Sequence, residues 1–80
     1  MTQNRNFQII VVDDDEDAAK TFAELIETKL KIPVISESNP STVLQIVRQE
    51  SIKIVVLDQR MPAMSGTELY KEIKKINPYI

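Results

Sequence analysis

Short uninterrupted runs of apolar residues alternate along the chain with longer segments in which apolar residues recur every three or four positions. The apolar runs at about residues 7–12, 32–36 and 53–57 predict strands. The segments between and after them have helical spacing and predict three amphipathic helices. Because strands and helices alternate, the order βαβαβα predicts an α/β fold, a doubly wound parallel sheet with right-handed crossovers.

Each predicted helix follows a residue whose side chain can accept hydrogen bonds from its first turn. These N-cap residues are Asp15, Asn39 and Ser65. Pro40 suits the first position of the second helix, and Ser65 with Glu68 has the spacing of a capping box. Pro33 at the start of the second strand favours an edge position in the sheet.

The helical spacing also predicts which side chains face the core. They are Ala18, Ala19, Phe22, Leu25, Ile26 and Leu30 in the first helix, Val43, Leu44, Ile46 and Val47 in the second, and Leu69, Ile73 and Ile76 in the third. The third helix is expected to stop at Asn77 and Pro78, because proline cannot continue it. The unbroken run at residues 54–57 predicts a strand that is covered on both faces.

Composition narrows the possible chemistry. Eighty residues form one small domain at most, and 42% apolar with 28% charged residues is ordinary for a globular protein. The net charge is −2, with five acidic residues in a row at 13–17, so charge does not suggest binding to nucleic acid or membranes. Without cysteine or histidine, disulfides and the usual zinc and triad chemistries are excluded. No stretch resembles a membrane span or a signal peptide, and the expected location is the cytoplasm.

Acidic residues follow two of the predicted strands directly. Asp13 and Asp14 come after the first strand and Asp58 after the third. Neighbouring parallel strands would bring these carboxylates together at one sheet edge, where open α/β sheets bind ligands. Two carboxylates about 4 Å apart repel by roughly 4 kcal/mol at an effective dielectric near 20, so the cluster needs a cation, and oxygen ligands suit Mg²⁺.

Other interpretations of these acidic residues stay open. Asp15, Glu16 and Asp17 are better explained as the solvated first turn of a helix. For Asp13 and Asp14 considered alone, that explanation and a metal site are equally acceptable. A lone carboxylate after a buried strand has no local structural role, and aspartate can accept a phosphoryl group, so Asp58 is the strongest candidate.

The chain resembles the receiver domain of bacterial two-component response regulators. Two features carry the resemblance. The first is the pair of acids after the first strand, and the second is the motif Asp-x-x-Met-Pro-x-Met-x-Gly after the third strand. The residues that match this motif are Asp58, Met61, Pro62, Met64 and Gly66. The resemblance spans essentially the whole chain and implies a flavodoxin-like fold, in which a complete domain has the sheet order 2-1-3-4-5.

The resemblance also implies roles for individual residues. Asp58 would accept a phosphoryl group from a sensor histidine kinase or a phosphotransfer protein. Mg²⁺ would be bound by Asp13, Asp14, Asp58 and the backbone carbonyl of Arg60, whose side chain would lie near the phosphoryl group and tune its lifetime. Such a domain is a regulatory phosphoprotein of a phosphorelay; it is not an enzyme beyond autophosphorylation and autodephosphorylation.

Residues 1–80 match only the first three βα units of a receiver, an incomplete domain. The fourth-strand Ser/Thr, the fifth-strand Lys and the surface that changes on phosphorylation have no counterpart in them. The main alternative function is therefore a non-signalling half-receiver that acts as a structural or self-association module through an exposed third-strand edge. A phosphatase with Asp58 as nucleophile is a weaker alternative, because Arg60 stands where such enzymes need a second acid.

The remaining motif residues have simpler explanations. Met61 and Met64 are expected to pack the loop, Pro62 to fix it, and Gly66 to permit a close approach. Three lysines on the third helix are expected to form a solvated face, and less readily a partner surface. They are Lys71, Lys74 and Lys75.

Overall fold

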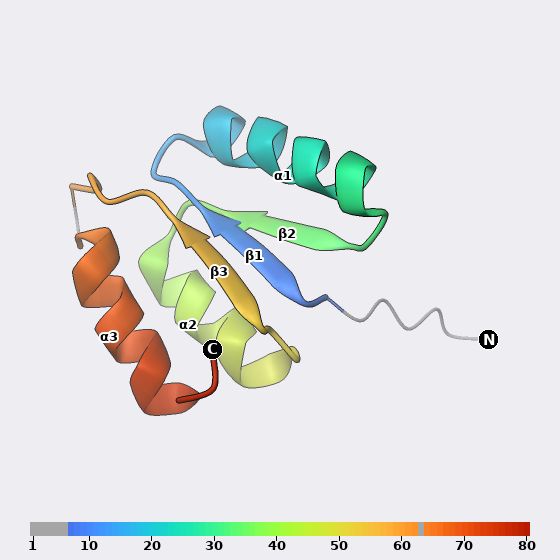
Figure 1. Cartoon of the computed structure of the whole chain (residues 1–80). Coiled ribbons are helices and arrows are strands. Elements are labelled where there is room, and N and C mark those ends of the chain that lie inside the picture. The colour runs from blue at the N-terminus through green and yellow to red at the C-terminus, as the bar shows by residue number, and fades with distance from the viewer. Residues whose placement is uncertain (1–6, 63) are drawn as a thin grey trace.

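Three parallel strands form the centre of the protein in a computed structural model that describes residues 7–62 and 64–80. They are β1 (Ile9–Val12), β2 (Val34–Glu37) and β3 (Ile54–Leu57), in the order β2-β1-β3 (Figure 1). This order is that of the first three strands of the predicted flavodoxin-like sheet, which confirms the fold class. β1 and β3 begin later than predicted, and β2 is displaced toward the C-terminus by one to two residues.

Helices cover both faces of the sheet (Figure 1). α1 (Glu16–Leu30) lies on one face, and α2 (Pro40–Gln49) and α3 (Gly66–Ile76) lie together on the other. Side chains of β1 alternate between the two layers. Ile10 and Val12 pack with α2 and α3, and Val11 packs with α1. The core is therefore two layers that share β1.

β1 and β3 differ in how completely they are covered. All four residues of β1 are buried, whereas Ile54 of β3 is 53% exposed and the other three β3 residues are half-buried. The prediction that β3 is covered on both faces is wrong, because α1 lies over β1 and β2 and covers that face of β3 only in part, with Val56 half-buried and Ile54 exposed. β1 and β2, in contrast, each have helices on both sides.

The buried face of α1 also differs from the prediction. Ala19 and Ala23 are buried, whereas Phe22 is 45% and Leu25 53% exposed. Small side chains let the helix approach the sheet closely, so the contact is centred on the alanines. Ala18 and Leu30 are exposed as well. Helical spacing located an apolar stripe but could not show which edge of it touches the sheet.

The three predicted N-caps are confirmed. Asp15 accepts hydrogen bonds from the N–H groups of Asp17 and Ala18, and Asn39 accepts one from Ser41. Ser65 and Glu68 form a complete capping box.

The end of α3 also lies where the sequence predicts it. The helix stops before Asn77. The ammonium of Lys74 donates there to the carbonyls of Pro78 and Ile80. This lysine therefore holds residues 78–80 against α3 and is not part of a solvated face.

The capping box predicts a pH-dependent contribution of Glu68 to stability. Its carboxylate accepts the Ser65 N–H, which is the main reason that the pKa of Glu68 lies below its ordinary value of 4.5; the Ser65 side chain and the charge of Lys71 also lower it. A depressed pKa means that the stabilisation is present above pH 4.5 and is lost as the pH falls through the folded-state pKa. Glu68→Gln should lower the free energy of unfolding at pH 7 and leave it unchanged at strongly acidic pH.

Urea titrations of the wild type and the Glu68→Gln variant at both pH values measure this difference. Glu72→Gln, on the same helix but paired only with Lys75 among the described residues, is the matched control. An equal loss of stability at both pH values would show that the side chain stabilises α3 without its charge.

The two outer edges of the sheet are not equivalent. On the β2 edge, the Val34 N–H donates to the carboxylate of Glu27 at 2.8 Å. On the β3 side, the N–H groups of Ile54 and Asp58 point inward to carbonyls of Gln8 and Val12. Since backbone groups alternate along a strand, Val55 and Leu57 direct theirs to the outer edge. The β2 edge is partly closed by a side chain, and β3 has β1 as its one strand partner within the described residues.

Candidate functional site

The three predicted carboxylates meet at the carboxyl end of the sheet. Asp13 follows β1 directly and Asp58 follows β3 directly. Because β1 and β3 pair in parallel, with Val12 opposite Leu57, the two strands end at the same level. Asp13, Asp14 and Asp58 each offer one carboxylate oxygen, and these oxygens lie within 4.8 Å of one another. Sequence spacing alone could not give this distance; the register of β1 and β3 does.

Backbone hydrogen bonds orient two of these carboxylates. One oxygen of Asp13 accepts the N–H of Asp15 at 3.0 Å, and one oxygen of Asp58 accepts the N–H of Arg60 at 3.2 Å. Each is a short loop closed by an aspartate onto the backbone two residues on. Asp13 and Asp58 are half-buried and Asp14 is exposed, so the cluster is open to solvent on one side.

The electrostatics of the cluster favour a cation. The pKa of the Asp14 carboxyl is raised above its ordinary value of 3.8, first by desolvation, then by its hydrogen bond with Asp13 and by the charges of Asp13 and Asp58. A nearby positive charge would oppose this shift. Three carboxylates with oxygens this close form a donor set suited to a hard divalent ion. The residues present therefore fit such an ion.

The loop between β3 and α3 is built as predicted for its methionines. Met61 is buried in the core with α2 and α3, and Met64 packs against the same cluster. Gly66 makes the close approach: a Cβ built on it would lie 2.7 Å from the carbonyl oxygen of Asp58. The backbone of the acidic site thus rests directly on the first turn of α3.

Gln59 and Thr67 were not predicted to take part in this loop, but the structure joins them. The Gln59 side-chain oxygen accepts the Thr67 N–H at 3.0 Å, and its amide nitrogen donates to the Thr67 hydroxyl at 2.9 Å. The sequence marked Gln59 only as a polar residue directly after Asp58. No periodicity in the sequence could link it to Thr67, which lies eight positions later.

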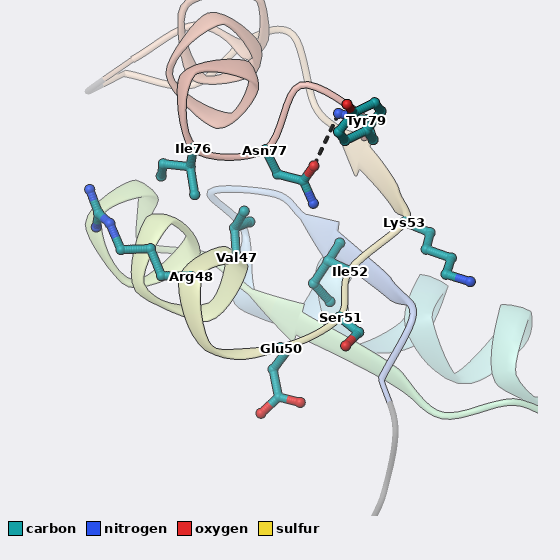
Figure 2. Close-up of a pocket in the computed structure, with 9 residues that line it drawn as sticks. All are labelled: Val47, Arg48, Glu50, Ser51, Ile52, Lys53, Ile76, Asn77 and Tyr79. Atoms are coloured by element: carbon teal, nitrogen blue, oxygen red, sulfur yellow. Dashed lines mark hydrogen bonds between the residues drawn. The ribbon is translucent and has the colours of Figure 1, made fainter.

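A surface pocket of about 530 Å³ lies at the opposite end of β3 from the acidic site (Figure 2). Val47, Ile52 and Ile76 form its apolar lining. Arg48, Glu50 and Lys53 border the pocket, but Figure 2 shows their charged groups directed away from it. The pocket therefore lacks the convergent polar groups of a catalytic site, and the acidic cluster is the candidate functional site.

No helix among the described residues has both the length and the apolar character to cross a membrane.

Comparison with known families agrees with the fold and the site. The response regulator receiver domain matches residues 9–80, which is nearly the whole chain. The protein therefore belongs to the response regulator receiver domain family, the regulatory class of two-component signalling.

Individual relatives support this assignment. The chain is 33% identical over 69 residues to a response regulator receiver protein of Anaeromyxobacter sp., covering 86% of this chain and 29% of the relative. It is 36% identical over 76 residues to the probable transcriptional regulator ycf27 of Porphyra purpurea, covering 91% and 30%. It is 34% identical over 70 residues to the transcriptional regulatory protein CpxR homolog of Haemophilus influenzae, covering 88% and 30%. The chain thus spans just under a third of the length of these relatives.

Proposed function

We propose that the protein is a cytoplasmic phosphoacceptor module in which Asp58 receives a phosphoryl group from a sensor histidine kinase or a phosphotransfer protein. The observation that carries this proposal is the meeting of Asp58 with Asp13 and Asp14 at the end of β1 and β3. A lone aspartate after a strand would be ambiguous. An aspartate with two further carboxylates beside it, in a member of the receiver family, has surroundings suited to phosphoryl transfer.

In the proposed reaction, a carboxylate oxygen of Asp58 attacks the phosphorus of a phosphohistidine. A P–O bond forms as the P–N bond breaks, and the leaving imidazole keeps the electron pair. The Arg60 N–H binds one oxygen of the Asp58 carboxylate, which fixes the direction of the attacking group. Asp58 thereby becomes an acyl phosphate, and the added negative charge would alter contacts of the surrounding loops. The later loss of this group to water is the only further chemistry that we assign to the domain.

Mg²⁺ would be held by Asp13, Asp14, Asp58 and the backbone carbonyl of Arg60. When bound, this ion neutralises negative charge on the transferring phosphoryl group. Asp13 has one oxygen engaged with the Asp15 N–H, and its carboxylate would supply a ligand oxygen to the ion. The charged form of Asp14, whose pKa is raised in part by its charged neighbours, would be favoured by the added positive charge.

Incubation with acetyl phosphate and Mg²⁺, followed by intact mass spectrometry, tests the phosphoacceptor role. We expect a mass gain of one phosphoryl group that is lost in hydroxylamine, as an acyl phosphate requires, and that maps to the peptide containing Asp58. No uptake by the folded protein, or a hydroxylamine-stable label on a serine or threonine, would contradict the proposal.

Mg²⁺ should stabilise the folded protein, because a ligand that binds the native state alone stabilises it by mass action. At an ion concentration ten times the dissociation constant the gain is about 1.4 kcal/mol, or several degrees in melting temperature for a domain of this size. Thermal melts with MgCl₂ and with chelator measure the shift. Asp13→Asn should reduce it, whereas Asp17→Asn, an exposed acid of the same run, should not. An unchanged shift in Asp13→Asn would argue against Asp13 as a ligand.

We also propose self-association through the outer edge of β3 as a second function, because no side chain among the described residues is seen to close this edge as Glu27 partly closes the β2 edge. Val55 and Leu57 direct backbone groups outward, Ile54 is 53% exposed, and such an edge favours pairing with another chain. We expect a concentration-dependent dimer or larger assembly.

Light scattering after size-exclusion chromatography, across a dilution series, measures this association. Ile54→Lys should shift the protein to monomer, because a charged edge disfavours strand pairing. Leu30→Lys is the matched control, since Leu30 is 56% exposed but lies on α1. A wild-type monomer at all concentrations would rule out the β3 edge as an association surface.

A further inference from the structure

Gln59, the residue directly after Asp58, is tied to the first turn of α3 by its main chain and its side chain. Its carbonyl accepts the Gly66 N–H at 3.3 Å, and its side-chain oxygen accepts the Thr67 N–H at 3.0 Å. The Thr67 hydroxyl lies 2.9 Å from the amide nitrogen and 3.2 Å from the amide oxygen of Gln59. One residue of the acidic loop therefore makes several hydrogen bonds to the start of the next helix.

These contacts bind most of the backbone N–H groups at the start of α3 that have no partner within the helix. The first N–H groups of a helix have no partner within the helix. Here Gly66 and Thr67 donate to Gln59, and Glu68 donates to the Ser65 side chain at 3.1 Å. Two of these three donors are bound to Gln59, so the position of α3 and the position of Gln59 depend on each other.

The same contacts fix the backbone on both sides of Gln59. The Asp58 carbonyl lies against Gly66, so closely that a Cβ there would be 2.7 Å away. The Arg60 N–H holds one oxygen of the Asp58 carboxylate at 3.2 Å. A shift of Gln59 would therefore move both the peptide that carries Asp58 and the N–H that orients its carboxylate.

We propose that Gln59 is a positioning residue, and that its clamp on Thr67 holds the Asp58–Arg60 segment in the geometry needed for metal binding and phosphoryl uptake. This inference rests on the proposed function of Asp58. Gln59 touches no reacting atom; it acts through the backbone of Asp58 and Arg60. The competing explanation is that Gln59 is a helix cap of α3 and contributes stability alone.

Matched variants separate the two explanations. Gln59→Met keeps the shape of the side chain and removes its hydrogen bonds. Thr67→Val removes the hydroxyl and keeps the N–H, and Thr67→Ser restores the hydroxyl. Ser65→Ala is the control for stability, since it removes a different cap from the same helix start without touching Gln59. All measurements are made on proteins shown to be folded by circular dichroism.

The first readout needs neither metal nor phosphate. Amide exchange measured by NMR should be roughly fivefold to tenfold faster at Arg60 in Gln59→Met, the scale of one lost hydrogen bond. Thr67→Val should show a smaller increase, and Ser65→Ala and Thr67→Ser should show none. Equal exchange rates at Arg60 in Gln59→Met and Ser65→Ala would show that Gln59 acts only as a helix cap, which would overturn the inference.

The second readout is the affinity for Mg²⁺, obtained by NMR titration with MgCl₂. Gln59→Met should weaken binding by roughly fivefold to tenfold, on the same scale, while Ser65→Ala leaves it unchanged. Unchanged affinity in Gln59→Met would also overturn the inference. If the wild type itself binds no Mg²⁺, the proposed metal site is wrong, and exchange at Arg60 still decides whether Gln59 holds this segment.

Discussion

Asp58→Asn should abolish phosphoryl uptake and at the same time make the metal-free protein more stable. An amide is no nucleophile toward phosphorus, so acetyl phosphate should add no mass to the variant. The asparagine oxygen can still accept the Arg60 N–H that Asp58 accepts at 3.2 Å, so the loop keeps its hydrogen bond. What the substitution removes is one of three charges whose oxygens lie within 4.8 Å of one another.

The size of the stability gain follows from Coulomb's law. Two charges about 4 Å apart repel by about 1 kcal/mol in water and about 4 kcal/mol at an effective dielectric of 20. The cluster is partly exposed, so the lower value applies, and we expect a gain on the order of 1 kcal/mol in the free energy of unfolding. Urea midpoints of both proteins in chelator measure it.

Asp15→Asn is the matched control for this experiment. Asp15 belongs to the same acidic run but caps α1, and asparagine is an equally good N-cap. The control should take up phosphate like the wild type and gain no stability in chelator. If Asp58→Asn is clearly less stable than the wild type in chelator, Asp58 is a structural hydrogen-bond acceptor and its proposed role is wrong.

Gly66→Ala should destabilise the protein even though alanine is the better helix former. Helix propensity alone predicts a gain of up to about 1 kcal/mol. The new Cβ, however, would lie 2.7 Å from the Asp58 carbonyl oxygen and 2.8 Å from the side-chain oxygen of Gln59. The glutamine side chain can rotate away, but the Asp58 backbone can move only together with the acidic site. Overpacking of this kind costs about 1–3 kcal/mol, so the clash should exceed the propensity gain.

The same variant should also take up phosphate more slowly, because relief of the clash displaces Asp58. Urea titration and the acetyl phosphate reaction measure the two effects. Ser41→Ala, at an exposed position in the first turn of α2, measures a propensity gain without a backbone clash. If the Gly66→Ala protein is as stable and as reactive as the wild type, the loop accommodates the added Cβ without displacing Asp58, and the prediction is wrong.

Much of the fold follows from local properties of the sequence. Apolar runs against helical spacing separate strands from helices, because the two elements repeat their buried positions at different periods. The caps at Asp15, Asn39 and Ser65 were predictable from neighbouring residues, since a helix start needs acceptors within a few residues of itself. The acidic residues at the two strand ends were predictable as a group, because parallel strands end at one edge.

The tertiary structure decided what depends on contacts between distant residues. It placed the contact of α1 at Ala19 and Ala23, because close packing favours small side chains that an apolar stripe does not distinguish. It left one face of β3 only partly covered and partly closed the β2 edge with Glu27, since neither the position of α1 nor a side chain seven residues away is encoded in a strand's own pattern. It also joined Gln59 to Thr67, because their hydrogen bonds exist only once α3 packs beside β3.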